Sequence, residues 1–170
     1  MKNEHQNKEK SAVEKITSAG AGSENIQYVT VVIGGQLFGL QISQVHDVFV
    51  PESVTRVPLA PPEVQGVLNL RGRIVTAINM RRRLSLPALE GGQTMMAVGI
   101  EYKGESYGLV IDTVGEVLTL PVSSREPNPT NLDQRWAEIS AGVHRLDGQL
   151  MVILDVARLL GAMMSEPIAA

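Results

Sequence analysis

The sequence predicts a mainly β protein made of two small, similar barrels that pack side by side. Three observations lead to this prediction. The second half of the chain repeats the first, short apolar runs with a period of two alternate with Gly and Pro turns, and helical spacing is confined to brief stretches. Small closed or nearly closed barrels of about five short strands suit this pattern. We therefore expect two tandem five-stranded β-barrels of the SH3-like or OB-like kind, with a short C-terminal helix.

The repeat consists of two blocks that keep their order along the chain. The block that begins at Phe38 returns at Tyr107, a shift of 69 positions (107 − 38 = 69), and the block that begins at Gly66 returns at Gly142, a shift of 76 positions (142 − 66 = 76). One copy alone has too little apolar surface to be comfortably stable. We therefore expect the two copies to share a core, and the junction between them is a favoured place for a partner to bind.

Composition limits the class of protein. The 170 residues are 44% hydrophobic and 19% charged, which is enough to build a core. The chain has no cysteine, which excludes disulfides and thiol nucleophiles and favours a reducing, intracellular location. No apolar run approaches the roughly 18 residues of a spanning helix. We expect a soluble, cytoplasmic protein that does not insert into the membrane, and its net charge of −3 gives no general attraction to nucleic acid.

The chain divides into two tails and two barrel halves. Residues 1–25 are polar and end in a run rich in Gly, Ala and Ser, which predicts a flexible N-terminal tail. The first barrel half is expected over residues 26–90 and the second over residues 91–162. Residues 163–170 then form a C-terminal tail.

A β-hairpin opens the first barrel half. Its turn is Gly34-Gly35, and the return strand carries apolar residues at period two, as does the matching strand of the second copy. Gly39 and Gly108 lie on the opposite face of these strands, where we expect another backbone to come close. The period-two residues are Phe38, Leu40 and Ile42 in the first copy and Tyr107, Leu109 and Ile111 in the second.

The spacing changes after these strands. Apolar residues three and four apart predict a short helical turn at residues 45–49 and again at 114–118. Proline-rich loops follow, and each copy then has a further strand, near residues 74–80 and 150–156. Asn79 and Asp155 stand where a side-chain oxygen caps a helix start, and Gly161 is well placed to end the final helix.

Catalytic and metal-binding patterns are missing from the sequence. His5, His46 and His144 are far apart, with no carboxylates at ligand spacing, so we expect no metal site. There is no nucleophile elbow, Walker loop or dinucleotide fingerprint, and the pairs Gly34-Gly35 and Gly91-Gly92 are interpreted as turns. We therefore expect a binding protein with no catalytic residue and no cofactor. The alternative hypothesis, an enzyme on a duplicated barrel, requires several polar side chains that converge in a deep pocket.

Arginines form the strongest charge cluster, at positions 71, 73 and 81–83. Recognition of single-stranded nucleic acid normally adds aromatic stacking platforms, and this chain has few aromatic residues to spare. Nucleic-acid binding therefore stays a remote alternative, and we interpret Arg81 to Arg83 as a solvated helix face. Arg71 is different, because the second copy has Asp147-Gly148 at this turn where the first has Arg71-Gly72. Two interpretations of Arg71 stay open. It is either an arginine tolerated in an exposed loop or a fork of donors that meets a partner's carboxylate or backbone.

Several of these segments together resemble the CheW family of chemotaxis coupling proteins. The signature segment is Gly66-Val67-Leu68-Asn69-Leu70-Arg71-Gly72, followed by Ile74-Val75 and Arg81-Arg82-Arg83-Leu84. Val54-Thr55-Arg56-Val57-Pro58 and the two repeated blocks are also similar to that family, so the resemblance covers residues 26–162. One departure is the segment Val75-Thr76-Ala77-Ile78-Asn79-Met80, where the family often has Val-Pro-Val-Ile-Asp-Leu.

The resemblance implies two packed barrels that act as a non-catalytic adaptor. Such an adaptor couples the histidine kinase CheA, through its regulatory domain, to the hairpin tips of chemoreceptors, and it associates with membrane receptor arrays only through these partners. A CheW-like adaptor of a non-flagellar sensory pathway fits equally well, and Val45 suits an ordinary core position as well as a contact. The residues that the resemblance implies for receptor binding, across the groove between the barrels and at the signature turn, are Ile42, Val45, Asp47, Gly66, Asn69 and Arg71, and those for kinase binding are Met96, Gly108 and Val117.

Overall fold

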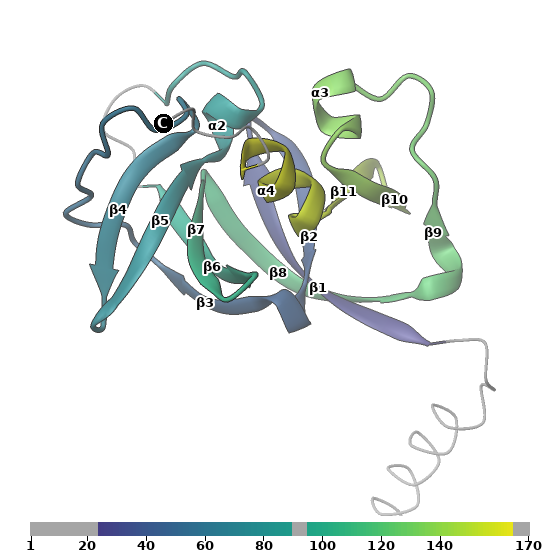
Figure 1. Ribbon diagram of the computed structural model, residues 1–170. Coiled ribbons are helices and arrows are strands. Elements are labelled where there is room, and N and C mark those ends of the chain that lie inside the picture. The colour runs from purple at the N-terminus through teal and green to yellow at the C-terminus, as the bar shows by residue number, and fades with distance from the viewer. Residues whose placement is uncertain (1–23, 90–94, 165–170) are drawn as a thin grey trace, which may run out of the picture.

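The computed structural model describes residues 24–89 and 95–164, and they form a mainly β protein (Figure 1). Residues 1–23 of the expected tail, the Gly91-Gly92 turn and residues 165–170 lie outside the described part. The first half contains β1 (Asn25–Ile33), β2 (Gln36–Gln41), the 3-10 turn η1 (Ile42–Gln44), β3 (Val45–Phe49), β4 (Val64–Leu70), β5 (Arg73–Asn79) and α2 (Met80–Arg83). The second half contains β6 (Met96–Tyr102), β7 (Glu105–Ile111), β8 (Thr113–Pro121), η2 (Val122–Ser124), β9 (Arg125–Glu126), α3 (Gln134–Ala137), β10 (Ser140–Leu146), β11 (Gln149–Leu154) and α4 (Val156–Met164).

The strands form two sheets that stand side by side, as the sequence predicts (Figure 1). Sheet A has six strands in the order β8-β1-β2-β11-β10-β9, and sheet B has five in the order β3-β6-β7-β5-β4. Among the described residues the outer strands of a sheet do not pair with each other, so each barrel stays open along one edge.

Each sheet takes strands from both halves of the sequence. The first two strands of one copy share a sheet with the later strands of the other: β1 and β2 with β8 to β11 in sheet A, and β6 and β7 with β3 to β5 in sheet B. Two parallel pairs, β2 with β11 and β5 with β7, join the halves within a sheet. The division at residue 90 thus separates two copies of a repeat, whereas the two sheets are interleaved.

The crossings between the sheets explain this exchange. After β2 in sheet A the chain turns through η1 and enters sheet B as β3, and after β7 in sheet B it passes Asp112 and enters sheet A as β8. Helical turns predicted at residues 45–49 and 114–118 are therefore wrong, because these residues belong to β3 and β8. Val48 and Val117 are 40% and 50% exposed, so the apolar spacing that suggested a helix does not mark one buried face.

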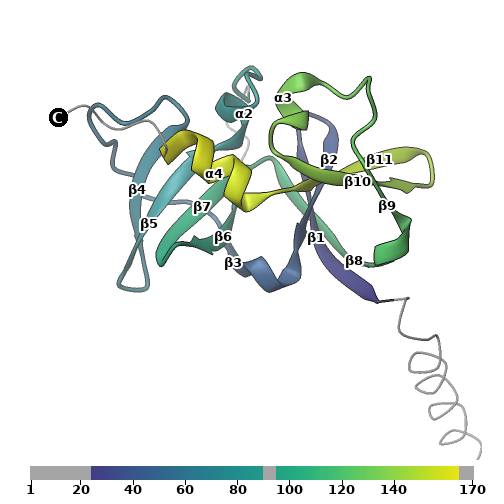
Figure 2. The same ribbon diagram turned by 45° about the vertical axis from the view of Figure 1, so that its right-hand side comes forward.

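One continuous core joins the two sheets. It contains Val31 and Phe38 of sheet A, Leu109 of sheet B, and Leu159 and Leu160 of α4. Figure 2 shows α4 lying across the strands between the two sheets. A smaller apolar cluster fills each sheet's own interior, around Tyr28 in sheet A and around Phe49 in sheet B. The shared core expected from the repeat is thus present.

Local signals are mostly correct. Gly34 and Gly35 both have positive φ and form the predicted first turn. The side chain of Asn79 accepts a hydrogen bond from the backbone N–H of Arg82, and that of Asp155 accepts one from Arg158 N–H, so both predicted caps are confirmed. The last helix differs from expectation, because α4 continues past Gly161 to Met164.

Candidate functional site

A cleft of about 270 Å³ lies on sheet B. Its walls come from β3, β6, β7 and the β4–β5 hairpin, and they include His46, Asp47, Arg71, Arg73 and Tyr107. The predicted site was a groove between the two barrels. This cleft is instead built from one sheet, and the predicted residues Asp47 and Arg71 meet inside it.

Arg71 and Asp47 form an ion pair at the cleft. Arg71 Nη1 lies 3.7 Å from Asp47 Oδ2, and their side chains are 78% and 26% exposed. Asp47 packs directly over Gly99 of the neighbouring strand, where a Cβ would collide with its carboxylate. The glycine therefore lets the carboxylate lie flat on the sheet, while the guanidinium stays in solvent. An exposed pair of this kind stabilises a fold by only about 0–1 kcal/mol, so most of Arg71's donor groups remain open to a partner.

The turn that carries Arg71 is tight and internally braced. Arg71 has φ 53° and Gly72 has φ 80°, the conformation of a two-residue hairpin turn. Asn69 Oδ1 accepts a hydrogen bond of 2.8 Å from Gly72 N–H, so this predicted contact residue holds the turn. Lys103 has φ 50° before Gly104, so the left-handed conformation alone does not mark Arg71 as functional.

Ile42 and Val45 lie where the chain crosses from sheet A to sheet B. Ile42 begins η1 and is 41% exposed, while Val45 is half-buried and packs against the shared core. Both belong to the segment that joins the two sheets. Both readings of Val45 are compatible with this position, because its side chain contacts the core and still reaches the surface.

Gly66 lies in a bulge of β4, away from the surface. It is buried with φ 152°, and a Cβ there would collide with the carbonyl oxygen of Thr55, which bridges to Val67. The second copy repeats this arrangement, because Gly142 has φ 129° and a Cβ there would lie 2.8 Å from the carbonyl oxygen of Glu126. The structure therefore gives Gly66 a backbone role that a matched glycine performs in the other sheet.

The three predicted kinase-binding residues are dispersed. Met96 is half-buried at the start of β6, and Val117 is 50% exposed on β8, the edge strand of sheet A. Gly108 is buried in β7, where a Cβ would lie 3.0 Å from Phe49 Cζ. The expectation that another backbone approaches Gly39 and Gly108 is wrong, because side chains fill both spaces, Met151 over Gly39 and Phe49 over Gly108.

Tyr107 closes the inner wall of the cleft. Its hydroxyl donates a 2.9 Å hydrogen bond to Glu105 Oε2. Burial, together with this carboxylate, raises the pKa of Tyr107 to about 12, so the phenol stays protonated near neutral pH. Among the described residues no group of three His, Asp or Glu is placed to hold a metal ion. The cleft is thus equipped for hydrogen bonding and charge recognition.

Arg81 overturns the interpretation of residues 81–83 as a solvated face. Its guanidinium makes two hydrogen bonds to Asp112, of 2.7 and 2.6 Å, and both side chains are 13% exposed. Asp112 Oδ2 also accepts a hydrogen bond from the backbone N–H of Gly34. Burial alone would raise the pKa of Asp112, but the hydrogen bonds from Arg81 and Gly34 outweigh it and hold that pKa below its usual value. This network ties α2, the first hairpin and the crossing between sheets together.

A buried polar cluster inside sheet A escaped the sequence analysis. His144 is 1% exposed and lies 3.1 Å from Tyr28 Oη through Nε2 and 3.1 Å from Ser124 Oγ through Nδ1. Ser124 donates its hydroxyl hydrogen to the carbonyl of Pro121, so Ser124 Oγ accepts from Nδ1–H and Nε2 accepts from the Tyr28 hydroxyl. The repeat contained a signal for this cluster, because His144 is equivalent to Leu68 of the first copy (144 − 76 = 68) and so replaces an apolar residue.

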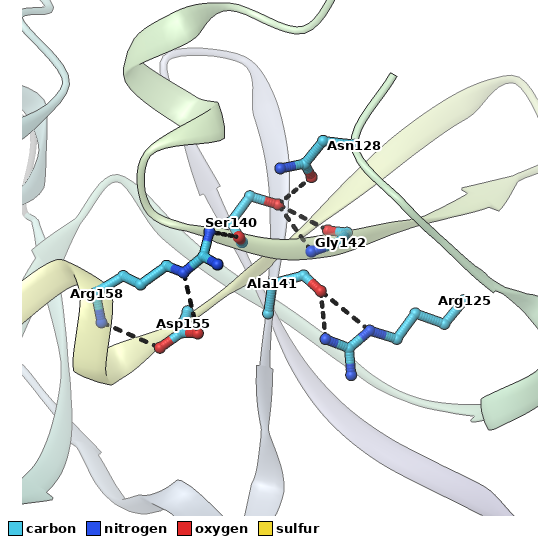
Figure 3. A network of polar contacts seen from close by, with 7 residues as sticks. All are labelled: Arg125, Asn128, Ser140, Ala141, Gly142, Asp155 and Arg158. Atoms are coloured by element: carbon cyan, nitrogen blue, oxygen red, sulfur yellow. Dashed lines mark hydrogen bonds and ion pairs between the residues drawn. The ribbon is translucent and has the colours of Figure 1, made fainter. Parts of the chain in front are cut away.

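A second polar network surrounds the start of β10 (Figure 3). Arg125 donates two hydrogen bonds to the carbonyl of Ala141, and Ser140 Oγ bonds to Asn128 and to the backbone of Gly142 (Figure 3). Arg158 of α4 reaches the carbonyl of Ser140. These contacts satisfy the backbone of the bulge at Gly142 and attach α4 to sheet A, so they have a structural role.

Comparison with known proteins agrees with this architecture. The profile of the CheW-like domain family matches residues 27–163. This chain belongs to the CheW-like domain family. Its mainly β fold of two adjoining sheets is confirmed by a solved CheW-like structure, that of scaffolding protein TtCheW from Thermoanaerobacter tengcongensis, with a TM-score of 0.71, 28% identity, and coverage of 80% of this chain and 92% of that one.

Curated relatives of this CheW-like chain share its length as well as its domain. Chemotaxis protein CheW of Treponema pallidum is 28% identical over 143 residues, which cover 82% of this chain and 84% of that protein. Chemotaxis protein CheW of Klebsiella aerogenes is 25% identical over 150 residues, 88% of this chain and 89% of that protein. Within the described residues, no helix has the length and apolar character needed to cross a membrane.

Proposed function

We propose that this chain is a non-catalytic, cytoplasmic adaptor that couples the hairpin tips of chemoreceptors to a histidine kinase of the CheA type. Membership of the CheW-like family supports the adaptor class, and the names of its relatives point to chemotaxis scaffolding. The observation that carries the receptor assignment is the cleft of sheet B. It presents a largely exposed guanidinium on a rigid turn beside the segment that crosses between the sheets.

Receptor recognition follows from the chemistry of this surface. A receptor tip is a helical hairpin with apolar and charged faces. Ile42 and Val45 do not line the cleft but shortly precede its residue His46 on the chain, and they offer apolar contact. Arg71 offers a planar fork of donors to a carboxylate or a backbone carbonyl. Asp47 orients the guanidinium from below without burying it. Individual contacts need only be modest in strength, because a receptor array supplies avidity.

The decisive variant is Arg71→Glu, tested by pull-down with a purified receptor cytoplasmic fragment. We expect receptor capture to fall strongly while the melting temperature stays within a few degrees, because an exposed pair contributes about 0–1 kcal/mol. Lys103→Glu is the matched control, since Lys103 is also an exposed cation with positive φ before a glycine. Unchanged capture by Arg71→Glu, or an equal loss with Lys103→Glu, would remove Arg71 from the receptor site.

The kinase partner and the pathway are tested separately. Co-purification from native extract identifies the kinase and receptor held by this chain, and thereby distinguishes a flagellar chemotaxis adaptor from a CheW-like adaptor of another sensory pathway. Recovery of neither partner, with the chain folded and abundant, would contradict the adaptor proposal.

A further inference from the structure

A short strap covers the buried histidine of sheet A. The strap consists of η2 and β9 (residues 122–126), and it leads from β8 to the outer edge of sheet A, beside β10 (Figure 2). Residues 122–125 of the strap are exposed, whereas His144, which Ser124 contacts, is 1% exposed. On this side a single layer of chain therefore separates the imidazole from solvent, and displacement of the strap would hydrate it.

The strap is attached to β10 by few contacts. β9 has 2 residues and forms two residue pairs with β10, one of which joins Arg125 to His144. The Arg125 guanidinium donates to the carbonyl of Ala141 (Figure 3), and Glu126 forms a 3.0 Å ion pair with Arg145. That ion pair is exposed and contributes only about 0–1 kcal/mol. Short, exposed edge segments of this kind open at lower free energy than the core of a sheet.

The site beneath the strap is built for a neutral imidazole. His144 Nδ1–H donates to Ser124 Oγ, and Nε2 accepts the hydroxyl hydrogen of Tyr28. Burial raises the pKa of Tyr28, so its hydroxyl keeps this hydrogen near neutral pH. A proton added to Nε2 would disrupt the bond, because two donors would then face each other. The closed strap thus leaves no place for the charged form of the ring.

Charges around His144 come from the strap itself. Among the described residues, Arg125 and Glu126 are the charged groups that act on it, and the facing residues of β1 and β11, Tyr28 and Met151, are uncharged. Burial lowers the pKa of His144, Arg125 lowers it further, and Glu126 opposes them with a smaller effect. Release of the strap hydrates the ring and carries the Arg125 guanidinium away, so it relieves both causes that disfavour the imidazolium.

We propose that the strap is an acid-sensitive latch, which protonation of His144 releases from β10. Release uncovers the outer backbone edge of β10, while the core shared by the two sheets stays folded. This latch is a property of the fold that goes beyond the adaptor function proposed above and does not depend on it.

Hydrogen exchange of the full chain, followed by NMR at pH 7.5, 6.5 and 5.5 and divided by the intrinsic exchange rates, tests the latch. In the open strap His144 titrates near its ordinary pKa of about 6.5, so the opening constant should rise up to about tenfold between pH 7.5 and 5.5. Protection of the backbone amides of β9, and of Val122 N–H, which donates to the carbonyl of Glu24, should fall by this factor.

Urea separates opening of the strap from unfolding of the whole chain. Exchange of the strap amides should be nearly insensitive to urea below about 1 M, because a local opening exposes little surface. Exchange through global unfolding instead accelerates steeply, with a dependence of about 1–3 kcal/mol per M. The wild type alone therefore decides whether the acid-sensitive opening is local.

Two substitutions of His144 test its role, and one of His46 is the control. His144→Gln keeps a side chain that hydrogen-bonds but takes up no proton, and His144→Leu introduces the residue of the first copy. In both variants the opening constant of the strap should change less than about twofold across this pH range. His46→Gln should keep the full response, because His46 lies on β3 of sheet B.

Three results would overturn the latch. One is strap protection in the wild type that does not change between pH 7.5 and 5.5. Another is strap exchange that occurs only through the urea-sensitive, global reaction. The third is an unchanged pH response in His144→Gln or His144→Leu, which would assign the proton to another group. Each of these results leaves the adaptor proposal standing.

Discussion

Replacing His144 with leucine should make the folding stability of this chain less dependent on pH. The first copy of the repeat already has Leu68 at the equivalent position, so the strand accepts that side chain in a closely related setting. In the wild type the imidazole is enclosed by Tyr28, by Ser124 and by the charged strand β9, whose Arg125 and Glu126 flank it. The variant removes the titrating group while keeping an apolar side chain of similar bulk.

The sign of the effect follows from burial. Burial lowers the pKa of His144, the nearby Arg125 guanidinium lowers it further, and Glu126 opposes them with a smaller effect. The unfolded chain therefore takes up a proton near pH 6.5 that the native state takes up only at lower pH. Between these two pKa values, the unfolding free energy of the wild type decreases by up to about 1.4 kcal/mol for each unit by which the pH is lowered. This component is present above pH 6.5 and absent from the variant at every pH.

Removing the imidazole also has a cost that does not depend on pH. Tyr28 is fully buried, and its hydroxyl loses the acceptor Nε2, which costs about 1–3 kcal/mol at pH 7.5. Ser124 keeps its bond to Pro121 and loses less. The double variant Tyr28→Phe with His144→Leu removes both partners, so its total cost should be smaller than the sum of the single costs.

Urea unfolding at pH 7.5, 6.5 and 5.5 tests this reasoning. The quantity of interest is the difference in unfolding free energy between wild type and variant at each pH, because titrations common to both proteins cancel. We expect His144→Leu to be less stable than the wild type at pH 7.5 and the gap to narrow as the pH falls. If the unfolding free energies of wild type and variant changed in parallel with pH, His144 would not be a buried neutral histidine. If the costs of the two single substitutions added fully in the double variant, the bond between His144 and Tyr28 would be refuted.

Two further predictions concern the ion pair that links the halves and the glycines of the two bulges. Asp112→Ala should lower the unfolding free energy at pH 7 by about 3 kcal/mol, because it leaves the nearly buried Arg81 unpaired. Chemical denaturation measures this loss, and a loss below about 1 kcal/mol would contradict the structural role of the pair. The depressed pKa of Asp112 further means that its contribution is present above about pH 4 and disappears as the pH falls through the native pKa, so wild type and variant should converge in acid. Gly66→Ala and Gly142→Ala should each reduce the melting temperature by several degrees, since a Cβ meets a backbone carbonyl at both bulges. A Gly66→Ala protein as stable as the wild type would show that the bulge of β4 relaxes freely.

Local features were predictable because their causes lie within a few residues. The turn at Gly34-Gly35 needs positive φ, and the caps at Asn79 and Asp155 need a short side-chain acceptor next to a helix start. The repeat revealed two equivalent units that share a core. The interleaving of strands was not predictable, because matched strands have the same apolar pattern in both copies, so exchanged and unexchanged arrangements bury similar residues.

Long-range polar contacts escaped prediction for a related reason. Arg81 looked like one of three solvated arginines, because its partner Asp112 is 31 residues away and follows a strand of the other half. At the candidate site, Asp47 and Arg71 were both selected, yet nothing in the sequence showed that they pair over Gly99. Gly66 was selected as a contact, and only the structure shows the carbonyl of Thr55 that requires a glycine there.

The proposed adaptor function depends on the stiffness of one strand. The candidate receptor turn at Arg71 directly follows β4, whose 7 residues run about 20 Å from first to last at roughly 3.3 Å per step. β4 pairs with β5, β5 pairs with β7 of the other half, and β7 contributes to the core that spans both sheets. A displacement of β4 and its turn would therefore require movement of the shared core rather than of a single loop. Transmission of a signal through the chain would need an element with two stable arrangements, whereas the pairing of β4 with β5 is interrupted only at the Gly66 bulge, which is closed by Thr55. We therefore propose that the chain holds its receptor contact in a fixed position and leaves the switching to its partners.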